Sequence, residues 1–266
     1  RNVTATFTLR QYTLTVTRNG TGTGTISSTP SGVTCPVSGA CTGTFNHGTV
    51  VQLVGNPASS SDFTMWMGGG CSGSGTCNVT MTAATTVPAY FTLKQHQLTA
   101  SVAGSGSGTI SSTPAGISCT KTGGTCMSAY THGTNVMLTA TATSGGGNTF
   151  AAWGGACTGI VTNTCQVSMT EARTVSATFT VGSNNLTVSV SGTGTVTSNM
   201  GGISCTESGG TCTQSYTFGQ VVRLTAAPGV GRSFGGWGGT CLAAGTSLTC
   251  DVTMDASKSA TATFDI

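Results

Sequence analysis

The sequence predicts an all-β protein, a tandem array of three small disulfide-stapled β domains with no substantial helix. Three observations carry this prediction: short stretches that alternate apolar and polar residues, turn-rich connections among 41 glycines, and one unit that recurs three times. No window keeps a helical period over three turns, and only the links 83–85, 171–173 and 255–257 are suited to a single helical turn. We expect each unit to fold as a β-sandwich or a β-grasp-like domain.

The repeat is visible in its landmarks. Trp66, Trp153 and Trp237 lie 87 and 84 residues apart, and the strings GTISSTPSGVTC, GTISSTPAGISC and GTVTSNMGGISC each lead to the first cysteine of a copy. Self-similarity at a fixed period is the signature of a repeat architecture. The expected boundaries are residues 11–94 for repeat 1, 95–182 for repeat 2 and 183–266 for repeat 3.

Each copy opens with an alternating stretch, at residues 14–17, 98–102 and 186–190. Glycine-rich strings such as GTGTG and GSGSG follow, and then a second alternating stretch. Alternation bounded by turn residues predicts a β-hairpin. Further strand candidates are VVQLVG, VMLTATA and VVRLTAA, then CNVTM, CQVSM and CDVTM, and last TTVPAYFTL, RTVSATFTV and KSATATFDI.

The segment RNVTATFTL at residues 1–9 aligns with RTVSATFTV at residues 173–181, so the closing strand occurs four times and everything else three times. We therefore expect residues 1–10 to be the closing strand of a preceding repeat, or a strand donated to another copy. In the second case the terminal strand completes the sheet edge of a neighbour, and head-to-tail contacts build a filament. The expected partners are thus neighbouring copies of the chain, joined through terminal β-strands.

Twelve cysteines in six close pairs indicate an oxidised, exported protein. Zinc is the rival interpretation, but zinc ribbons use C-x2-C knuckles, whereas five to eight residues separate these partners. Loops of variable length between similar flanks favour closure within each pair, as at hairpin tips, although four cysteines per repeat allow three connectivities. The expected pairs are Cys35 with Cys41, Cys71 with Cys77, Cys119 with Cys126, Cys157 with Cys165, Cys205 with Cys212, and Cys241 with Cys250.

Two groups of side chains are candidates for binding or chemistry. The three tryptophans are either ligand residues, as sugar-stacking platforms, or core residues packed on a disulfide, and the core interpretation is favoured. His47 and His132 occupy the same turn in two copies, where the third copy has Phe218. A catalytic base would not be replaced by phenylalanine in an equivalent module without loss, so a packing role is expected.

Composition and motifs argue against several classes of function. Charged residues make up 6% of the chain, against about 25% in an ordinary globular protein, and the net charge is +3, so no nucleic-acid partner is expected. Asp251 and Asp255 are too few for a calcium site. Hydrolase, zinc-protease, P-loop and haem motifs are missing, so we expect no enzyme activity, cofactor or metal. The sequence contains no run of 18 apolar residues of the kind that predicts a membrane span.

The stretches FTMWMGGGC, FAAWGGAC and FGGWGGTC, followed by CNVTM, CQVSM and CDVTM, resemble the divergent internalin-type B-repeat. That resemblance covers nearly the whole chain and implies a bacterial extracellular module without catalytic residues. It implies a secreted or cell-surface location and a structural role as a stalk or head-to-tail fibre. The alternative function is an adhesin, or a carbohydrate-binding module of a larger secreted protein, with glycans as partners.

Overall fold

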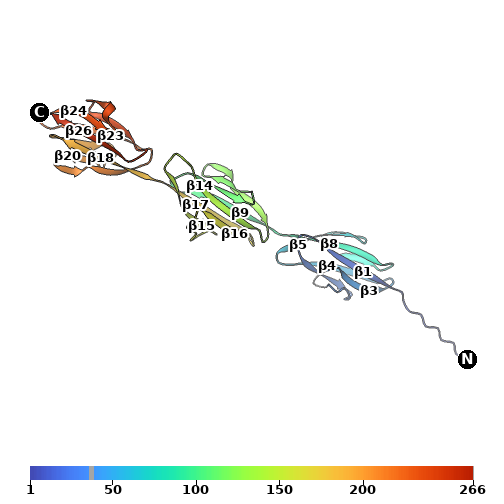
Figure 1. Ribbon diagram of the computed structural model, residues 1–266. Helices are drawn as coiled ribbons and strands as arrows, with labels where there is room; N and C mark the ends of the chain where they lie inside the picture. Colours follow the sequence, from blue (N-terminus) through green and yellow to red (C-terminus); the bar gives the residue numbers. More distant parts are fainter. Residues whose placement is uncertain (36–38, 266) are drawn as a thin grey trace. The chain divides into compact units, whose positions relative to one another are not determined.

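The computed structural model describes residues 1–35 and 39–265 of the chain (Figure 1). Residues 36–38, within the first cysteine loop, and Ile266, at the end of the last predicted strand, lie outside the described part. Almost every element is a β-strand, and the one helical element among the described residues is the 3-10 turn η1 (Leu242–Ala244). The predicted all-β class is confirmed.

The chain folds into two compact units. Unit 1 comprises Arg1–Leu98, Ala129–Asn135 and Ser168–Arg173, and unit 2 comprises Thr99–Ser128, Val136–Val167 and Thr174–Ile266. The strands of repeat 1 therefore lie in unit 1, those of repeat 3 lie in unit 2, and repeat 2 contributes to both.

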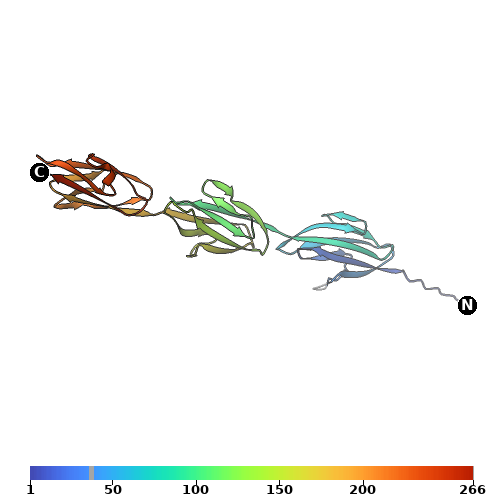
Figure 2. The ribbon, with the colours of Figure 1, turned by 45° about the horizontal axis from the view of Figure 1, so that its top comes forward.

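Repeat 1 forms two facing sheets, with strand orders β3-β1-β8-β5-β6 and β2-β4-β7. Figures 1 and 2 show the two layers. The strands are β1 (Gln11–Gly20), β2 (Gly24–Thr29), β3 (Cys41–Asn46), β4 (Val50–Pro57), β5 (Ser61–Gly68), β6 (Cys71–Gly73), β7 (Cys77–Thr80) and β8 (Thr85–Leu93).

Repeat 2 has the same plan, with sheets ordered β13-β9-β17-β15 and β12-β11-β10-β14-β16. Its strands are β9 (Gln95–Ala103), β10 (Gly108–Thr113), β11 (Ser118–Thr120), β12 (Gly123–Thr125), β13 (Met127–Thr131), β14 (Asn135–Ala142), β15 (Asn148–Gly155), β16 (Thr164–Ser168) and β17 (Arg173–Val181).

Repeat 3 follows this plan too, with sheets β22-β18-β26-β24 and β21-β20-β19-β23-β25. Its strands are β18 (Ser183–Ser191), β19 (Gly194–Ser198), β20 (Ser204–Thr206), β21 (Gly209–Thr211), β22 (Thr213–Thr217), β23 (Val221–Pro228), β24 (Ser233–Gly239), β25 (Thr249–Thr253) and β26 (Lys258–Asp265). Paired sheets in every copy make these domains β-sandwiches.

The closing strand lies in the middle of its sheet. In repeat 1, β8 pairs in parallel with β1, with Leu14 opposite Thr85, and antiparallel with β5, with Trp66 opposite Ala89. Strand β26 pairs in the same two ways with β18 and β24. Every second residue of a closing strand is buried, as for Val175, Ala177 and Phe179 in β17. The closing strand of each repeat is therefore held on both sides by strands of its own repeat and not by a neighbouring module.

The predicted hairpin at the start of each repeat is also wrong. Strands β1 and β2 lie in different sheets, because the glycine string between them crosses over the end of the closing strand. The Gly22 N–H donates to the Phe91 carbonyl at 2.9 Å, and Gly106 does the same to Phe179. Gly20 has φ +94°, and a Cβ there would overlap the Phe91 carbonyl oxygen. Two alternating stretches joined by a short glycine string fit a hairpin as well as a crossover between sheets. The sequence alone could not distinguish these two arrangements.

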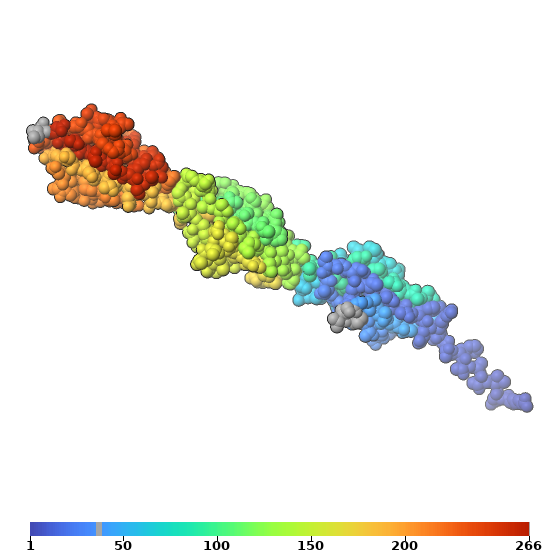
Figure 3. Space-filling model, viewed as in Figure 1, coloured from blue at the N-terminus to red at the C-terminus, as the bar shows by residue number. Residues whose placement is uncertain are grey.

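The links before the closing strands form bends and extended backbone rather than the single helical turn suggested by the sequence. Residues 1–10 form no strand, and Val3 and Phe7 are 95% and 91% exposed. In Figure 3 this segment, at the blue end of the chain, has no cover from other residues. Its assignment as the closing strand of a preceding repeat, or as a donated strand, stays a prediction.

Candidate functional site

The six disulfides join the neighbouring cysteines of each copy. The pairs are Cys35–Cys41, Cys71–Cys77, Cys119–Cys126, Cys157–Cys165, Cys205–Cys212 and Cys241–Cys250. The second pair of each repeat does not close a hairpin tip. In repeat 1 it links β6 of one sheet to β7 of the other. The disulfide therefore closes the loop in which the chain crosses from one sheet to the other.

The three tryptophans lie in the cores of their repeats. Trp66, Trp153 and Trp237 are 1%, 5% and 5% exposed. Each indole Nε1 donates a hydrogen bond of 2.7 to 2.9 Å to a carbonyl inside the second cysteine loop of its repeat. A phenylalanine packs against each ring at centroid distances of 4.9 to 5.4 Å. Rings covered in this way offer no face on which a sugar could stack.

His47, His132 and Phe218 occupy equivalent turns, and the turns of His132 and Phe218 lie beside the links between repeats. Repeats 1 and 2 are joined by a single residue between strands, Lys94, and repeats 2 and 3 by Gly182. The backbone N–H of His132 donates to the Lys94 carbonyl at 2.7 Å, and that of Phe218 donates to Gly182 at 2.9 Å. This shared backbone contact explains why imidazole and phenyl rings are both accepted at the position.

The two acidic residues singled out in the sequence form ion pairs. Asp251 accepts two hydrogen bonds from Arg223, at 2.7 and 2.8 Å, and Asp255 lies 2.8 Å from the Lys258 amine. These hydrogen bonds lower the pKa of both carboxyl groups. In the part of the chain that the structure describes, no three His, Cys, Asp or Glu residues gather as a metal site.

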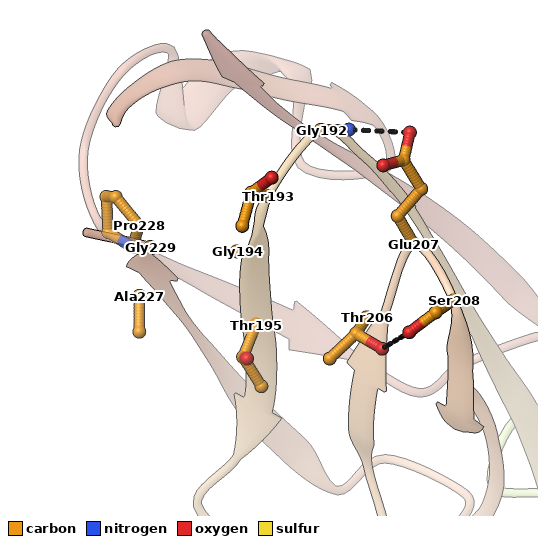
Figure 4. Close-up of a pocket in the computed structure, with 10 residues that line it drawn as sticks. All are labelled: Gly192, Thr193, Gly194, Thr195, Thr206, Glu207, Ser208, Ala227, Pro228 and Gly229. Carbon is orange, nitrogen blue, oxygen red and sulfur yellow. Dashed lines mark hydrogen bonds between the residues drawn. The ribbon is translucent and has the colours of Figure 1, made fainter. Parts of the chain in front are cut away.

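A pocket that the sequence did not predict lies in repeat 3, next to the crossover before β19 (Figure 4). Its volume is about 540 Å³, and Pro228 forms part of its wall. A Glu207 carboxylate oxygen accepts a hydrogen bond from the Gly192 N–H at 3.0 Å, and the hydroxyls of Thr206 and Ser208 lie 3.1 Å apart. Among the residues that line it, Glu207 alone has an ionisable side chain.

In repeat 2 a side chain of opposite charge contacts the equivalent crossover. The Lys121 amine donates to the Gly104 carbonyl at 2.6 Å, where repeat 3 uses Glu207 against the Gly192 N–H. Either side chain satisfies one backbone group of the crossover turn. Because the charge reverses between copies while the turn is kept, the contact serves the fold in both.

None of the helical residues described forms a segment long and apolar enough to cross a lipid bilayer. The chain was also compared with known proteins. No curated protein matches it.

Among solved structures, the Bacillus anthracis TIE protein matches with a TM-score of 0.54 and 9% identity, over 95% of this chain and 50% of that one. The chain thus spans half the length of that relative. The major pilin T-13 of Streptococcus pyogenes has a TM-score of 0.28 and 10% identity, over 64% of this chain and 96% of the pilin. The pilus adhesin SpaC of Lactobacillus rhamnosus GG has a TM-score of 0.31 and 8% identity, over 96% and 43%. The first likeness concerns the fold alone, and the two pilus proteins support no argument.

The family comparison is more specific. A model described as the divergent InlB B-repeat domain matches residues 12–95, 98–183 and 184–266. These stretches contain the tryptophan and cysteine motifs of each copy, which confirms the resemblance seen in the sequence. The protein therefore belongs to the divergent InlB B-repeat domain family, of which it contains three tandem copies.

Proposed function

We propose that the chain is a structural segment of a bacterial cell-surface or secreted protein, in which B-repeat modules form a stalk and do no catalysis. The observation that carries the proposal is the bonding of the one-residue links. Lys94 donates its N–H to the Ser60 carbonyl of repeat 1 at 3.0 Å and accepts from His132 of repeat 2. Gly182 donates to Gly147 at 2.8 Å and accepts from Phe218.

A link of this kind restricts bending. Only one residue separates the last strand of one repeat from the first strand of the next, and both of its backbone polar groups are used. The hydrogen bonds fix the peptide groups before and after the link residue to their own repeats, so bending is confined to the φ and ψ angles of that one residue, which steric contacts restrict. A spacer needs this property, since a flexible Gly/Ser linker would let its ends approach each other.

The cysteines support an extracellular location. All twelve are paired, and such pairing persists in oxidising compartments, whereas cytosolic thiols are kept reduced. Each bridge closes a short loop where the chain leaves a sheet. Small domains outside the cell use such staples because their cores are small.

Scattering in solution tests the stalk. The full chain is compared with a variant that carries Gly-Ser-Gly-Ser after Lys94, and with a control that carries the same insert after Val230, in an exposed turn of repeat 3. The wild type and the control should share a narrow distribution of maximum dimensions, and the link insertion should broaden it. Equal distributions for all three chains would show that the link does not limit bending.

Assembly through terminal strands is the finer part of this proposal. In residues 1–9 the apolar face formed by Val3, Ala5 and Phe7 is exposed, and in β17 the matching face is buried. A sheet without its closing strand would accept this segment between two strands. A synthetic RNVTATFTLR peptide should therefore restore the thermal transition of a variant that lacks both residues 1–9 and residues 258–266. A peptide in which Val3 and Phe7 are replaced by Ser is the control, and no difference between the two peptides would argue against strand donation.

The alternative function, adhesion, is favoured by one surface of repeat 1. On the outer face of its larger sheet, Met65 lies directly across from Tyr90, and Met67 is 51% exposed. Repeat 2 has Ala152, Thr178 and Gly154 at these positions. Replacing the three residues of repeat 1 by those of repeat 2 should leave the fold intact. If the chain adheres to host or bacterial glycans, that triple variant should bind a glycan array less than the wild type does.

A further inference from the structure

Repeat 2 contains a pair of histidines that face each other. His96 lies in β9, and His132 lies in the turn between β13 and β14. The His96 Nε2 and His132 Nδ1 atoms are 3.0 Å apart, and the ring centroids are 5.2 Å apart. Both side chains are half-buried and both belong to unit 1.

The pair is confined to this copy. Repeat 1 has Tyr12 and His47 at the two positions, with ring centroids 5.8 Å apart, and repeat 3 has Asn184 and Phe218. Other side chains therefore satisfy the packing at this end of the sandwich. The packing at this end of the sandwich therefore does not require two imidazole nitrogens that face each other.

The backbone on both sides of the pair is held in place. His132 donates its N–H to the Lys94 carbonyl at 2.7 Å, and Gly133 donates to the Met169 carbonyl at 3.0 Å. The Gln95 side chain, next to His96, donates to the Thr131 hydroxyl at 3.1 Å. Both rings thus extend from fixed backbone, so little conformational entropy remains to be lost when a ligand binds between them.

The facing nitrogens are joined by a hydrogen bond. They are 3.0 Å apart and the ring centroids 5.2 Å apart, so the two rings meet nearly end to end. An ion bonded to both nitrogens at about 2.0–2.1 Å would lie to one side of this line, and each ring would turn toward it. Imidazole nitrogen suits Cu²⁺, Ni²⁺ and Zn²⁺, and Cu²⁺ is the strongest binder of the three.

We propose that His96 Nε2 and His132 Nδ1 bind one Cu²⁺ ion, with water in the remaining positions. In the neutral pair one of the facing nitrogens carries the proton that the other accepts. When the metal binds, that proton moves to the other nitrogen of the same ring, so each ring keeps one N–H and presents a lone pair to the ion. The bound ion would cross-link the start of β9 to the turn after β13, at the end of repeat 2 that carries the Lys94 link.

This site stands independently of the proposed stalk function. Its test is titration of the oxidised full chain with CuCl₂, followed by calorimetry and by the nitrogen couplings in the EPR spectrum. The variants are His96→Asn and His132→Phe, which introduce the residues that repeat 3 carries at the same positions. His47→Phe is the matched control, and the double variant measures background binding. All twelve cysteines are in disulfides, so thiols do not compete.

The wild type and His47→Phe should bind one Cu²⁺ per chain with two imidazole nitrogens. Each single variant at the pair should bind at least about tenfold more weakly. The proposal is overturned if the wild type binds no better than the double variant, or if either single variant binds as the wild type does. If a variant unfolds, paramagnetic broadening in the wild type decides: the ring signals of His96 and His132 should broaden before those of His47, and equal broadening of all three refutes the site.

Discussion

The indole Nε1 of Trp66 donates a 2.7 Å hydrogen bond to the carbonyl oxygen of Gly75, inside the loop closed by the Cys71–Cys77 disulfide. The same relation joins Trp153 to Thr162 and Trp237 to Ser247. Tryptophan, disulfide and crossing loop are therefore one structural unit, used three times. A ring that holds its loop in this way is part of the fold, and its removal has a measurable cost.

Trp153→Phe should lower the free energy of unfolding of repeat 2 by about 1–3 kcal/mol, because a hydrogen bond and part of the packing are lost. Trp153→Ala should cost about 3–5 kcal/mol. Differential scanning calorimetry of the full chain measures both as a shift of one transition, with the other two repeats as internal references. An Ala variant as stable as the wild type would place the ring at the surface and reopen the ligand interpretation.

Replacing both Cys157 and Cys165 by Ala should destabilise repeat 2 by about 2–2.5 kcal/mol. The chain-entropy model predicts this for a loop of eight residues, and the buried position of both sulfurs adds a small packing loss. Differential scanning calorimetry of the full chain measures the change as a shift of one transition. Reduction of the wild type opens all six bridges and should shift the transition of repeat 2 by at least as much, and an unchanged transition after reduction would mean that the bridge does not form.

Gly20→Ala should destabilise repeat 1 by at least about 1–2 kcal/mol, because φ there is +94° and the added methyl group meets the Phe91 carbonyl. Gly75→Ala is the control in the same repeat, since a Cβ there has open space around it. Thermal unfolding by circular dichroism compares the two variants. Equal melting temperatures would contradict the crossover as the reason for this glycine.

Acid should weaken repeat 3 through its ion pairs. The hydrogen bond from Arg223 lowers the pKa of Asp251 in the folded state below the unfolded value of about 3.9. A depressed folded-state pKa contributes stability that is present above the unfolded value and is lost as pH falls through the folded value. Between pH 7 and pH 2, the wild-type urea midpoint for repeat 3 should fall further than that of Asp251→Asn. Parallel curves would show that the pair contributes nothing.

Much of the molecule was predictable from local pattern. Alternating stretches such as VVRLTAA and CDVTM became β23 and β25, because a strand buries every second residue whatever its partner is. The three-copy organisation came from spacing alone. The tryptophan motifs were correctly assigned to the family, although the interpretation of the rings as ligand or core residues could not be decided without their burial.

The pairing of the strands could not be predicted from the sequence. The string GTGTG between two alternating stretches fits a hairpin and a sheet-to-sheet crossover equally, and only the carbonyl of Phe91, some seventy residues later, distinguishes them. The pocket near Glu207 and the facing rings of His96 and His132 also depend on residues far apart in the chain. No local signal marks such encounters.

By itself the sequence determined the β class, the repeat, the oxidised cysteines and the family, since each depends on residue type and short-range spacing. The tertiary structure decided which strands are neighbours, that each closing strand is central to its own sheet, and that the tryptophans are covered. The physical reason is that a period of two encodes which face of a strand is buried and nothing about the strand beside it. Pairing is chosen by the packing of the whole domain, where parallel contacts such as that of β1 with β8 join segments at opposite ends of a repeat.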